Sequence, residues 1–482
     1  MSIATKEPEH DTSPPPPSVR SNIRLLFVSQ MVRRIFRVGL FFIAGRFLGV
    51  ETFGAYAVLL TVVEMVATIS GVGYIDYLTR EIAKEPAKGR RLWLEVTKVR
   101  LSYTLPALVI GFGLLKLMGF SSLSIANAAL LSVTLLPRIM GELAQGVLKG
   151  LQIFSPLLWI EVIQGLAVLA LAAMFVFNGY GLRGIITAEI ISAFVGCFFA
   201  LASMVRHSSA ATVEPVKFGR LFRSTFAFNV YPLIVNMYDR ADVLLISKIV
   251  GNFATGIYAF PYRIHAMFGL IPVSVVGALL PKFSAPDGDD AFRKCSQAMG
   301  FLYTVALLGV LGAAAFATPV IQLILGPSYA ASGLVIKILT WATIPSFFGC
   351  PLLTLLLANG KEKSFVWMCS VCMVFNIGAN LLLIPRFSYI AAAVVTILTE
   401  CVLLAQNLYL VHRSFGRLVL PSHVGRITAA FIAAFGSFWL LRLFTSEVVA
   451  GVFTFGAFFS FAAWTNRDLL RLRYPGRRPI HS

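Results

Sequence analysis

The sequence predicts an all-α integral membrane protein of about fourteen transmembrane helices, arranged as two six-helix lobes plus two C-terminal helices. Its apolar composition, its long apolar runs and the distribution of its basic residues all favour this fold. Of the 482 residues, 57% are apolar and 13% charged, whereas soluble domains are about half apolar and about a quarter charged. One water-exposed fold could not bury so much apolar surface, so the chain belongs in a membrane.

Each apolar run is long enough to cross a hydrocarbon layer of about 30 Å as a helix. In chain order, the predicted helices span residues 23–48, 53–76, 99–118, 123–148, 155–179, 182–205, 224–249, 253–280, 295–319, 331–358, 364–384, 390–411, 425–444 and 447–465. Twelve helices are the alternative if one apolar pair is misassigned. An odd number would break the alternation of charge between successive loops.

Basic residues distinguish the two sides of the predicted membrane. If the N-terminus lies inside, 28 of the 41 Lys and Arg residues fall in inner loops and tails, and five fall at outer turns and adjoining helix ends. The positive-inside rule therefore predicts that both termini are cytoplasmic. This orientation accounts for most of the net charge of +19, and no zinc-ligand spacing, RNP-like strand or basic heptad indicates a nucleic-acid partner.

The topology divides the chain into six segments. The N-terminal tail contains four consecutive prolines and no apolar signal segment, which predicts disorder in the cytoplasm. The basic C-terminal tail is expected to lie near anionic membrane lipids. The predicted segments are 1–22 (N-terminal tail), 23–205 (N-lobe), 206–223 (cytoplasmic linker), 224–411 (C-lobe), 412–465 (the last two helices with the preceding cytoplasmic loop) and 466–482 (basic tail).

An internal repeat relates the two lobes. The stretch from Arg46 to Ala57 matches the stretch from Lys248 to Ala259 at a constant offset of 202 residues, with two glycines and a tyrosine in equal positions. Both stretches form a short outer turn between an odd-numbered helix and the next helix. Since the copies are an even number of helices apart, we expect a pseudo-twofold axis along the membrane normal. Parallel repeats of this kind build transporters around a central site.

The first predicted helix carries three arginines near its centre, Arg33, Arg34 and Arg37. At about 100° per residue they fall within one arc of the helix. A charge at mid-membrane costs at least ~2.5 kcal/mol, so it normally faces a cavity or a partner. Glu64 on the second helix could pair with one of these arginines, but one carboxylate cannot neutralise three. We expect a cationic cavity wall, with a purely structural ion network as the alternative.

The second lobe carries a balanced set of charges. Asp239, Arg240 and Asp242 lie on the seventh helix, and Arg263 lies on the eighth. Two acids and two bases predict ion pairs among these four residues. Such pairs could break and reform as a cavity opens and closes, or carry a proton. No cofactor is expected beyond H⁺ or Na⁺ coupling.

The remaining polar residues of the helices are less informative. Arg138 and Glu142 are four residues apart and predict a structural ion pair. Glu189, Lys337 and Glu400 are isolated within their helices, and each is a candidate for a cavity or a helix contact. The six cysteines lie mostly in apolar runs, which predicts buried apolar side chains and no metal site. The sequence has no Walker-type motif, HExxH or GxSxG, so we do not expect an enzyme.

Four motifs in register resemble those of the Wzx-type polysaccharide flippases. This family belongs to the multidrug/oligosaccharidyl-lipid/polysaccharide (MOP) exporter superfamily, which also holds lipid II flippases and multidrug and toxin extruders. The motifs are Ala44-Gly-Arg-Phe-Leu-Gly49 with Phe53-Gly-Ala-Tyr56, Leu78-Thr-Arg-Glu-Ile-Ala83, Asp239-Arg-Ala-Asp-Val-Leu-Leu245 with Gly256-Ile-Tyr-Ala259, and Leu325-Gly-Pro-Ser-Tyr-Ala330. The resemblance extends from about Leu25 to the end of the twelfth helix.

The resemblance implies alternating-access export of a polyprenyl-pyrophosphate-linked oligosaccharide across the bacterial cytoplasmic (inner) membrane, for surface polysaccharide or exopolysaccharide biosynthesis. Polysaccharide polymerase or export machinery is the expected protein partner. The predicted residues of the substrate-binding cavity are Arg33, Arg34, Arg37, Arg240 and Arg263. All but Arg240 match cationic cavity positions of the family. The predicted ion-coupling or gating residues are Glu64, Asp239 and Asp242.

Other functions stay open from the sequence. A cation-coupled multidrug antiporter of the same superfamily would need unpaired acids in its cavity, whereas the first helix has an excess of arginine. A non-transporting membrane subunit of a polysaccharide synthase complex would not need two repeated, proline-containing lobes. An embedded transferase is a weaker alternative, because the chain has no large soluble loop.

Overall fold

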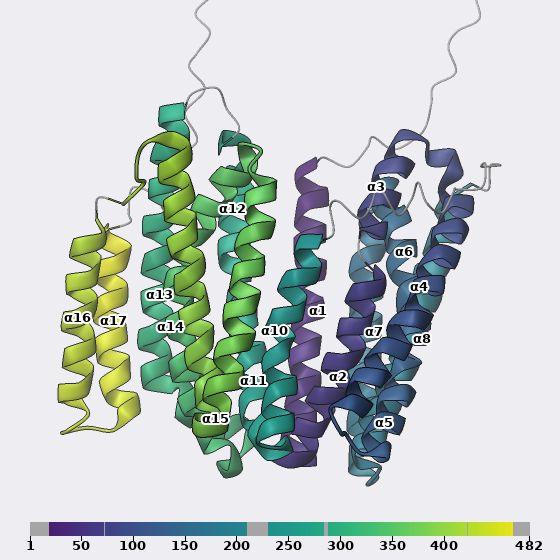
Figure 1. Ribbon diagram of the computed structural model, residues 1–482, viewed down its shortest axis with the longest axis horizontal. Coiled ribbons are helices and arrows are strands. Elements are labelled where there is room, and N and C mark those ends of the chain that lie inside the picture. The colour runs from purple at the N-terminus through teal and green to yellow at the C-terminus, as the bar shows by residue number, and fades with distance from the viewer. Residues whose placement is uncertain (1–18, 72, 210–229, 284–287, 422, 466–482) are drawn as a thin grey trace, which may run out of the picture.

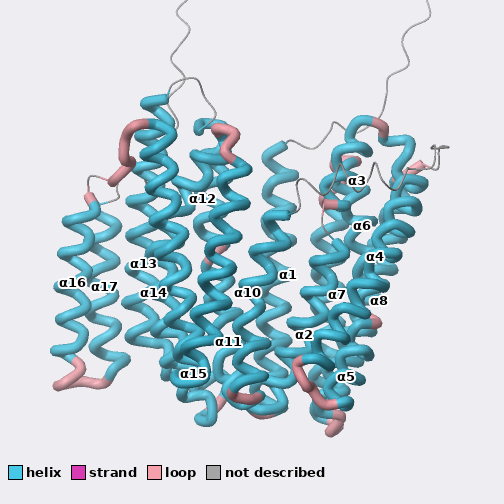
Figure 2. Tube along the Cα trace, viewed as in Figure 1, coloured by secondary structure: helices cyan, strands magenta, loops and turns pink. Residues whose placement is uncertain are grey.

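The computed structural model describes residues 19–71, 73–209, 230–283, 288–421 and 423–465. These residues form helices joined by short turns, and no strand occurs among them. The helices run side by side along one direction (Figure 1), and most turns gather at the two ends of the bundle (Figure 2). Helices satisfy their backbone polar groups within one segment, which a hydrocarbon environment requires. The predicted all-α membrane fold is confirmed.

The first half of the chain forms one group of helices. In order, its elements are α1 (Val19–Leu48), α2 (Val50–Gly71), α3 (Tyr74–Lys84), η1 (Pro86–Lys88), α4 (Gly89–Leu117), α5 (Ser122–Ser132), α6 (Leu135–Gly150), α7 (Ser155–Phe177) and α8 (Gly181–His207). Gly49 has a φ of 79° in the turn between α1 and α2, a conformation that favours glycine.

The second half forms a neighbouring group, with the last two helices at its far edge (Figure 1). Its elements are α10 (Val230–Ile249), α11 (Asn252–Phe268), α12 (Leu270–Phe283), α13 (Gly288–Leu325), η2 (Pro327–Tyr329), α14 (Ala330–Ala358), α15 (Glu362–Phe415), α16 (Val424–Leu441) and α17 (Glu447–Thr465). We call the end of the bundle that carries the α1–α2 and α10–α11 turns the outer end, and the opposite end the inner end.

Eleven helices of the described residues are long and apolar enough to cross a membrane. α1 and α10 are not among them because charged residues interrupt their apolar sequence, yet they pack against α7 and α15 inside the bundle. α15 counts once although two helices are merged in it. With these additions the structure reproduces the predicted series of about fourteen crossings.

The long helix α15 turns back on itself at Ser388, where φ is 56°. Asn376 Nδ2 donates to Thr399 Oγ1 at 3.1 Å across this turn. The two halves of α15 therefore lie side by side in opposite directions. They correspond to the predicted helices 364–384 and 390–411.

The two copies of the repeat cross each other at the outer end, where α2 packs against α11. A Cβ atom on Gly54 would overlap the carbonyl oxygen of Asn252. In the same way, a Cβ atom on Gly256 would overlap the carbonyl oxygen of Val50. Val50 and Asn252 are equivalent at the 202-residue offset, so the contact is reciprocal. Glycine lets the two backbones approach this closely.

A second contact covers the outer end of α1. The hydroxyl of Tyr329 in η2 donates to the carbonyl of Gly45 at 3.0 Å, and its ring meets Phe53 edge-on with centroids 6.3 Å apart. Tyr329 belongs to the second lobe and both of its partners belong to the first. This contact and the glycine crossing together close the lobes against each other at the outer end.

The last two helices contact the second lobe through α13 and α14. A Cβ atom on Gly451 would overlap Ala315 of α13, so α17 packs tightly there. Lys337 of α14 forms an ion pair with Glu447 at the start of α17. Lys337 was predicted to be isolated within its own helix and to face a cavity or another helix, and it makes a contact between helices. Its partner lies 110 residues away in sequence.

Much of the predicted segmentation concerns residues that the structure does not describe. The segments 1–22 and 206–223 lie largely outside the described residues, and 466–482 lies wholly outside them. The five boundaries between the six segments stay predictions. Within the described residues, the start of α1 and the end of α17 lie at the same, inner end of the bundle (Figure 1).

Candidate functional site

Arg33 projects from α1 towards α7 and α6. Its Nε donates to Glu161 Oε2 at 2.8 Å, and a second guanidinium nitrogen bonds to the other oxygen of the same carboxylate. Gln145 Oε1 accepts a further, longer bond at 3.3 Å. The bidentate pair is strong because both bonds are charge-assisted. The Glu161 side chain is 7% exposed and that of Arg33 is 51% exposed, so the arginine remains accessible.

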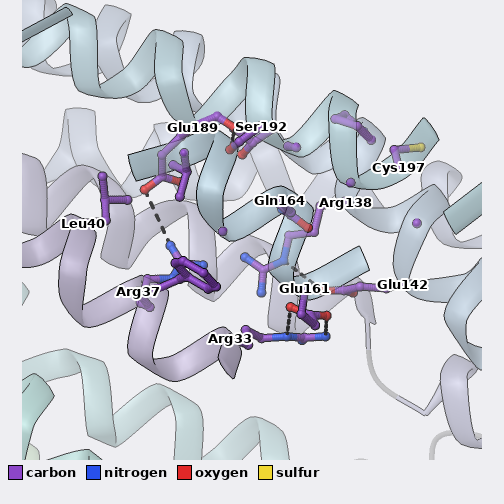
Figure 3. Close-up of a pocket in the computed structure, with 18 of the residues that line it drawn as sticks. Arg33, Arg37, Leu40, Arg138, Glu142, Glu161, Gln164, Glu189, Ser192 and Cys197 are labelled. Carbon is purple, nitrogen blue, oxygen red and sulfur yellow. Dashed lines mark hydrogen bonds and ion pairs between the residues drawn. The ribbon is translucent and has the colours of Figure 1, made fainter. Parts of the chain in front are cut away.

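Arg37 lies one turn further along α1 and faces α8. Its guanidinium lies 3.5 Å from Glu189 Oε1, and the hydroxyl of Tyr56 donates to the same carboxylate. Figure 3 shows Arg33 and Arg37 directed at these different acids. Glu189, predicted to be a residue of a cavity or of a helix contact, thus contacts both α1 and α2.

Arg34 differs from its two neighbours on α1. Its side chain is half-buried, and no carboxylate of the described residues lies within 4.0 Å of it. The three arginines that the sequence grouped together thus divide into two paired residues and one unpaired residue. The predicted excess of positive charge is located at Arg34.

Glu64 on α2 joins the two lobes. Its Oε2 accepts from Arg263 on α11 at 2.9 Å and also from Arg240 on α10. Only 8% of the Glu64 side chain is exposed. The expectation that Glu64 pairs with an arginine of the first helix is wrong, because both of its partners belong to the other lobe. The guanidinium of Arg263 also lies 5.1 Å above the ring of Phe41.

The ion pairs predicted within the second lobe are also wrong. Asp242 accepts from the Tyr258 hydroxyl at 2.8 Å and from Asn380 Nδ2 at 2.7 Å. Asp239 lines a cavity of the C-lobe together with Asp242. The two acids are three residues apart and share one face of α10, whereas Arg240 lies on the face that meets α2. The direction of each side chain around the helix therefore decides its partner.

The C-lobe cavity has a volume of about 230 Å³ and lies between α10, α11, α14 and α15. Its polar lining comprises Asp239, Asp242, Tyr262, His265, Thr343, Ser346, Asn376, Thr396, Thr399 and Glu400. Carboxylate, hydroxyl and amide oxygens of this kind suit a proton or a small hard cation. Among the described residues, no group of three His, Cys, Asp or Glu side chains is arranged to hold a metal ion.

The repeat extends from the outer turns into the hydrogen bonds of both lobes. Tyr56 and Tyr258 occupy the same repeat position and are completely buried. Tyr56 donates to Glu189 within the N-lobe, and Tyr258 donates to Asp242 within the C-lobe. The repeated tyrosine is thus the sequence signal that could have indicated a carboxylate partner for each lobe.

A second cavity lies inside the N-lobe between α1, α6, α7 and α8, with a volume of about 150 Å³. Arg138 Nε donates to Glu142 Oε1 at 2.9 Å, which confirms the predicted pair. Arg100 of α4 also donates to Glu142 at 3.0 Å. Figure 3 shows the charged side chains converging on the cavity from several helices. The charged lining residues are Arg33, Arg37, Arg138, Glu142, Glu161 and Glu189.

The cysteines are free thiols, and four of the six are buried. Cys369 and Cys372 are 2% and 1% exposed within an apolar part of α15. The prediction that these two act as small buried apolar residues agrees with their environment.

A model of the family described as polysaccharide biosynthesis protein matches residues 19–285, more than half of the chain. The chain belongs to this family. The Haloferax volcanii protein named Probable flippase AglR is 22% identical to this polysaccharide biosynthesis protein over 369 residues, which cover 73% of this chain and 75% of that protein. The resemblance to Wzx-type flippases drawn from the sequence is confirmed.

Solved structures share the fold. The lipid II flippase MurJ, in an inward closed conformation, superposes with a TM-score of 0.74 and 14% identity over 93% of this chain and 100% of that chain. An inward-facing multidrug resistance transporter of the MATE family superposes with a TM-score of 0.64 and 14% identity, over 82% of this chain and 97% of that chain. The polysaccharide biosynthesis protein therefore has the fold of the MOP superfamily.

Proposed function

We propose that this protein moves a polyprenyl-pyrophosphate-linked oligosaccharide across the bacterial cytoplasmic membrane by alternating access, as a step in surface polysaccharide biosynthesis. Membership of the polysaccharide biosynthesis family and similarity to a protein named a flippase support the proposal. In this proposal both termini are cytoplasmic, and polymerase or export machinery takes the product at the outer face. The observation that carries it is the excess of arginine over carboxylate at Glu64, where the lobes meet.

Arginine is in excess over carboxylate at two places. Arg34 has no carboxylate partner among the described residues, and Arg240 and Arg263 share the single carboxylate of Glu64. A pyrophosphate cannot cross hydrocarbon unaided, but guanidinium groups offer its oxygens bidentate, charge-assisted hydrogen bonds. A cationic interface between two rocking lobes can therefore carry the head group while the lipid tail stays in the bilayer.

The mechanism follows from competition for the same guanidinium groups. The lobes are closed at the outer end, so the substrate enters from the inner side. Its pyrophosphate competes with Glu64 for Arg240 and Arg263. Once these arginines bind phosphate, Glu64 no longer holds the lobes together, and the outer crossing of Gly54 and Gly256 can separate.

The C-lobe cavity is the place where we propose that H⁺ or Na⁺ acts. Asp239 and Asp242 line this cavity on one face of α10, while Arg240 on another face binds Glu64. Neutralising the acids changes the packing of α10, and α10 transmits the change to the bridge between the lobes. The driving cation and the substrate would then use separate sites on a shared helix.

A cation-coupled multidrug antiporter is the second candidate, favoured by the acids of the C-lobe cavity and by the fold shared with a MATE transporter. Against it stands the interface itself, because unpaired arginine repels a cationic drug. A synthase subunit that does not transport would not need two lobes that meet at the outer end through the glycine crossing and Tyr329.

Replacing Arg34 tests the proposed function directly. Arg34→Gln should lower the rate of transport of a polyprenyl-pyrophosphate oligosaccharide into proteoliposomes about tenfold, because a charge-assisted bond to phosphate is lost. Arg24→Gln is the matched control, since Arg24 is an exposed residue of the same helix. Full activity of both Arg34→Gln and Arg263→Gln would contradict the proposal.

Deletion of the gene in cells tests the alternative of a synthase subunit. If the protein is a flippase, completed lipid-linked oligosaccharide units should accumulate on the cytoplasmic face. Failure to assemble these units would indicate a synthase subunit.

A further inference from the structure

The N-lobe cavity differs in charge from the interface between the lobes. Each of its three guanidinium groups faces a carboxylate. The pairs are Arg33 with Glu161, Arg37 with Glu189 and Arg138 with Glu142. Positive and negative groups balance among the residues that line the cavity, although Arg100, which does not line it, shares Glu142 with Arg138. A pyrophosphate could bind there only by breaking existing pairs. The cavity is suited to a neutral ligand with many hydrogen-bonding groups.

Two uncharged polar side chains of the cavity have hydrogen-bond donors and acceptors that no described residue uses. Gln164 of α7 lines the cavity, and its amide makes no hydrogen bond to any described residue. Gln145 of α6 accepts only the long bond from Arg33. An amide held inside a membrane protein without partners is costly. These amides therefore indicate a ligand that both donates and accepts hydrogen bonds.

The shape of the cavity also favours a compact polar ring. Gly165 accommodates the ring of Phe36, and Gly196 accommodates the side chain of Gln164, so both groups lie close against the helices instead of filling the space. An ordered water needs ~10–15 Å³, and about 150 Å³ therefore holds about ten waters. This is the scale of one sugar ring, not of a whole oligosaccharide.

We propose that the N-lobe cavity binds a neutral pyranose, namely the sugar joined directly to the pyrophosphate of the carrier lipid. The inference rests on the proposed function. Sugar hydroxyls donate to carboxylates and accept from guanidinium groups, so a ring of hydroxyls can bridge the existing pairs without breaking them. Arg33 lines the cavity and Arg34 is the next residue of α1, so the proposed phosphate contact is one residue away from the cavity wall. An acidic sugar would add an uncompensated charge.

Binding of three defined lipids to the full-length protein in nanodiscs tests this inference. The probes are polyprenyl pyrophosphate alone, the same lipid carrying one glucose, and the same lipid carrying one glucuronic acid. The wild-type protein should bind the glucosyl lipid about tenfold more tightly than the bare lipid, as expected for two or so additional hydrogen bonds. The glucuronosyl lipid should bind no better than the bare lipid.

The variant Gln164→Leu should reduce binding of the glucosyl lipid about fivefold and leave binding of the bare lipid unchanged. Ser192→Ala, at a second cavity residue, should act in the same direction and is the alternative if Gln164→Leu does not fold. Gln297→Leu on the exposed side of α13 is the matched control and should change neither affinity.

The sugar site would be overturned by equal wild-type affinity for the bare and glucosyl lipids, or by equal losses of affinity for both lipids in Gln164→Leu and Ser192→Ala. Preference for the glucuronosyl lipid would also overturn it. The proposed function fails separately, because it requires the bare pyrophosphate lipid to bind and Arg34→Gln to weaken that binding. A normal response to Arg34→Gln without any sugar preference would refute only the inference made here.

Discussion

At the scale of single residues, the ion pairs of Glu64 are the contact between the lobes that an anionic ligand can most readily displace. Two guanidinium groups of the C-lobe depend on this one buried carboxylate of the N-lobe. Removing one partner of a buried ion pair leaves an uncompensated charge and is costly. A dianionic ligand can replace the carboxylate without that cost. The same contact can therefore hold the empty protein and yield to the substrate.

Glu64→Gln should bind bare polyprenyl pyrophosphate more tightly than the wild-type protein does, by about threefold, because the internal competitor is gone. Transport should nevertheless slow, since the lobes lose a contact that must reform in each cycle. Glu81→Gln is a suitable control, because Glu81 pairs with Arg80 and Lys84 on α3, away from the interface. Weaker binding by Glu64→Gln would show that Glu64 orients the arginines and does not compete with the ligand.

The sequence located the arginines of the site but not their partners. Arg33 and Glu161 are 128 residues apart, and Arg263 and Glu64 are 199 residues apart. Pairs over such separations depend on how each helix is rotated and which neighbour it meets, and one sequence carries no direct record of either. Arg138 and Glu142 could be paired in advance because four residues on one helix fix their geometry.

At the scale of elements, α10 presents different chemistry on two faces. The face with Asp239 and Asp242 belongs to the C-lobe cavity, and the face with Arg240 meets α2. Arg240 therefore makes no ion pair with Asp239 or Asp242, although these acids are only one and two residues away in sequence. A rigid helix is a simple means of coupling two such sites, because a rotation moves both faces together.

Asp239→Asn should therefore uncouple transport from the cation gradient. We expect the rate in proteoliposomes to become independent of an imposed H⁺ or Na⁺ gradient, while the affinity for polyprenyl pyrophosphate remains within about twofold of the wild-type value. Asp289→Asn is the control, because the Asp289 side chain is 82% exposed at the inner end of α13. A gradient dependence that survives in Asp239→Asn would locate the coupling elsewhere.

The crossing of α2 and α11 supports a prediction about conformation. Gly54→Leu should prevent closure of the outer end, since even a Cβ atom would overlap the backbone of Asn252. Distances between spin labels on the outer turns should lengthen, and transport should stop. Gly113→Leu is the control, because no heavy atom lies within 4 Å of the position that its Cβ would occupy.

A melting curve of each glycine variant separates misfolding from a shift in conformation. If Gly54→Leu is folded and its outer turns keep the wild-type separation, the crossing does not gate the protein. Gly256→Leu, at the equivalent repeat position, should reproduce the effect of Gly54→Leu.

At the scale of the whole molecule, most of the fold could be predicted from length, hydropathy and charge. The membrane environment forces each apolar run of about 20 residues to become a helix, so counting runs nearly counts helices. The internal division of the long helix α15 was also foreseen, since the charged Arg386 marks its outer turn. What could not be predicted is which helices touch across the lobes, because the apolar faces of membrane helices resemble one another.

The orientation in the membrane is testable with single cysteines on a cysteine-free background. Lys361→Cys lies in the turn between α14 and α15. It should react with an impermeant maleimide only when the reagent is present on the inner side of the membrane. Arg183→Cys, at the outer end of α8, should react from the opposite side. Both native side chains are exposed. Labelling of both cysteines from one side would contradict the positive-inside assignment.

The reciprocal contact between the outer turns has a consequence for the origin of the molecule. In a twofold homodimer, if residue i of one subunit touches residue j of the other, then j also touches i. Gly54 with Asn252 and Gly256 with Val50 obey this rule at the offset of 202 residues. The lobes thus meet as two subunits of a homodimer would, which is the arrangement expected from duplication and fusion of a six-helix ancestor. Two copies within one chain can differ in sequence, and here one lobe carries the paired arginines and the other the acidic cavity.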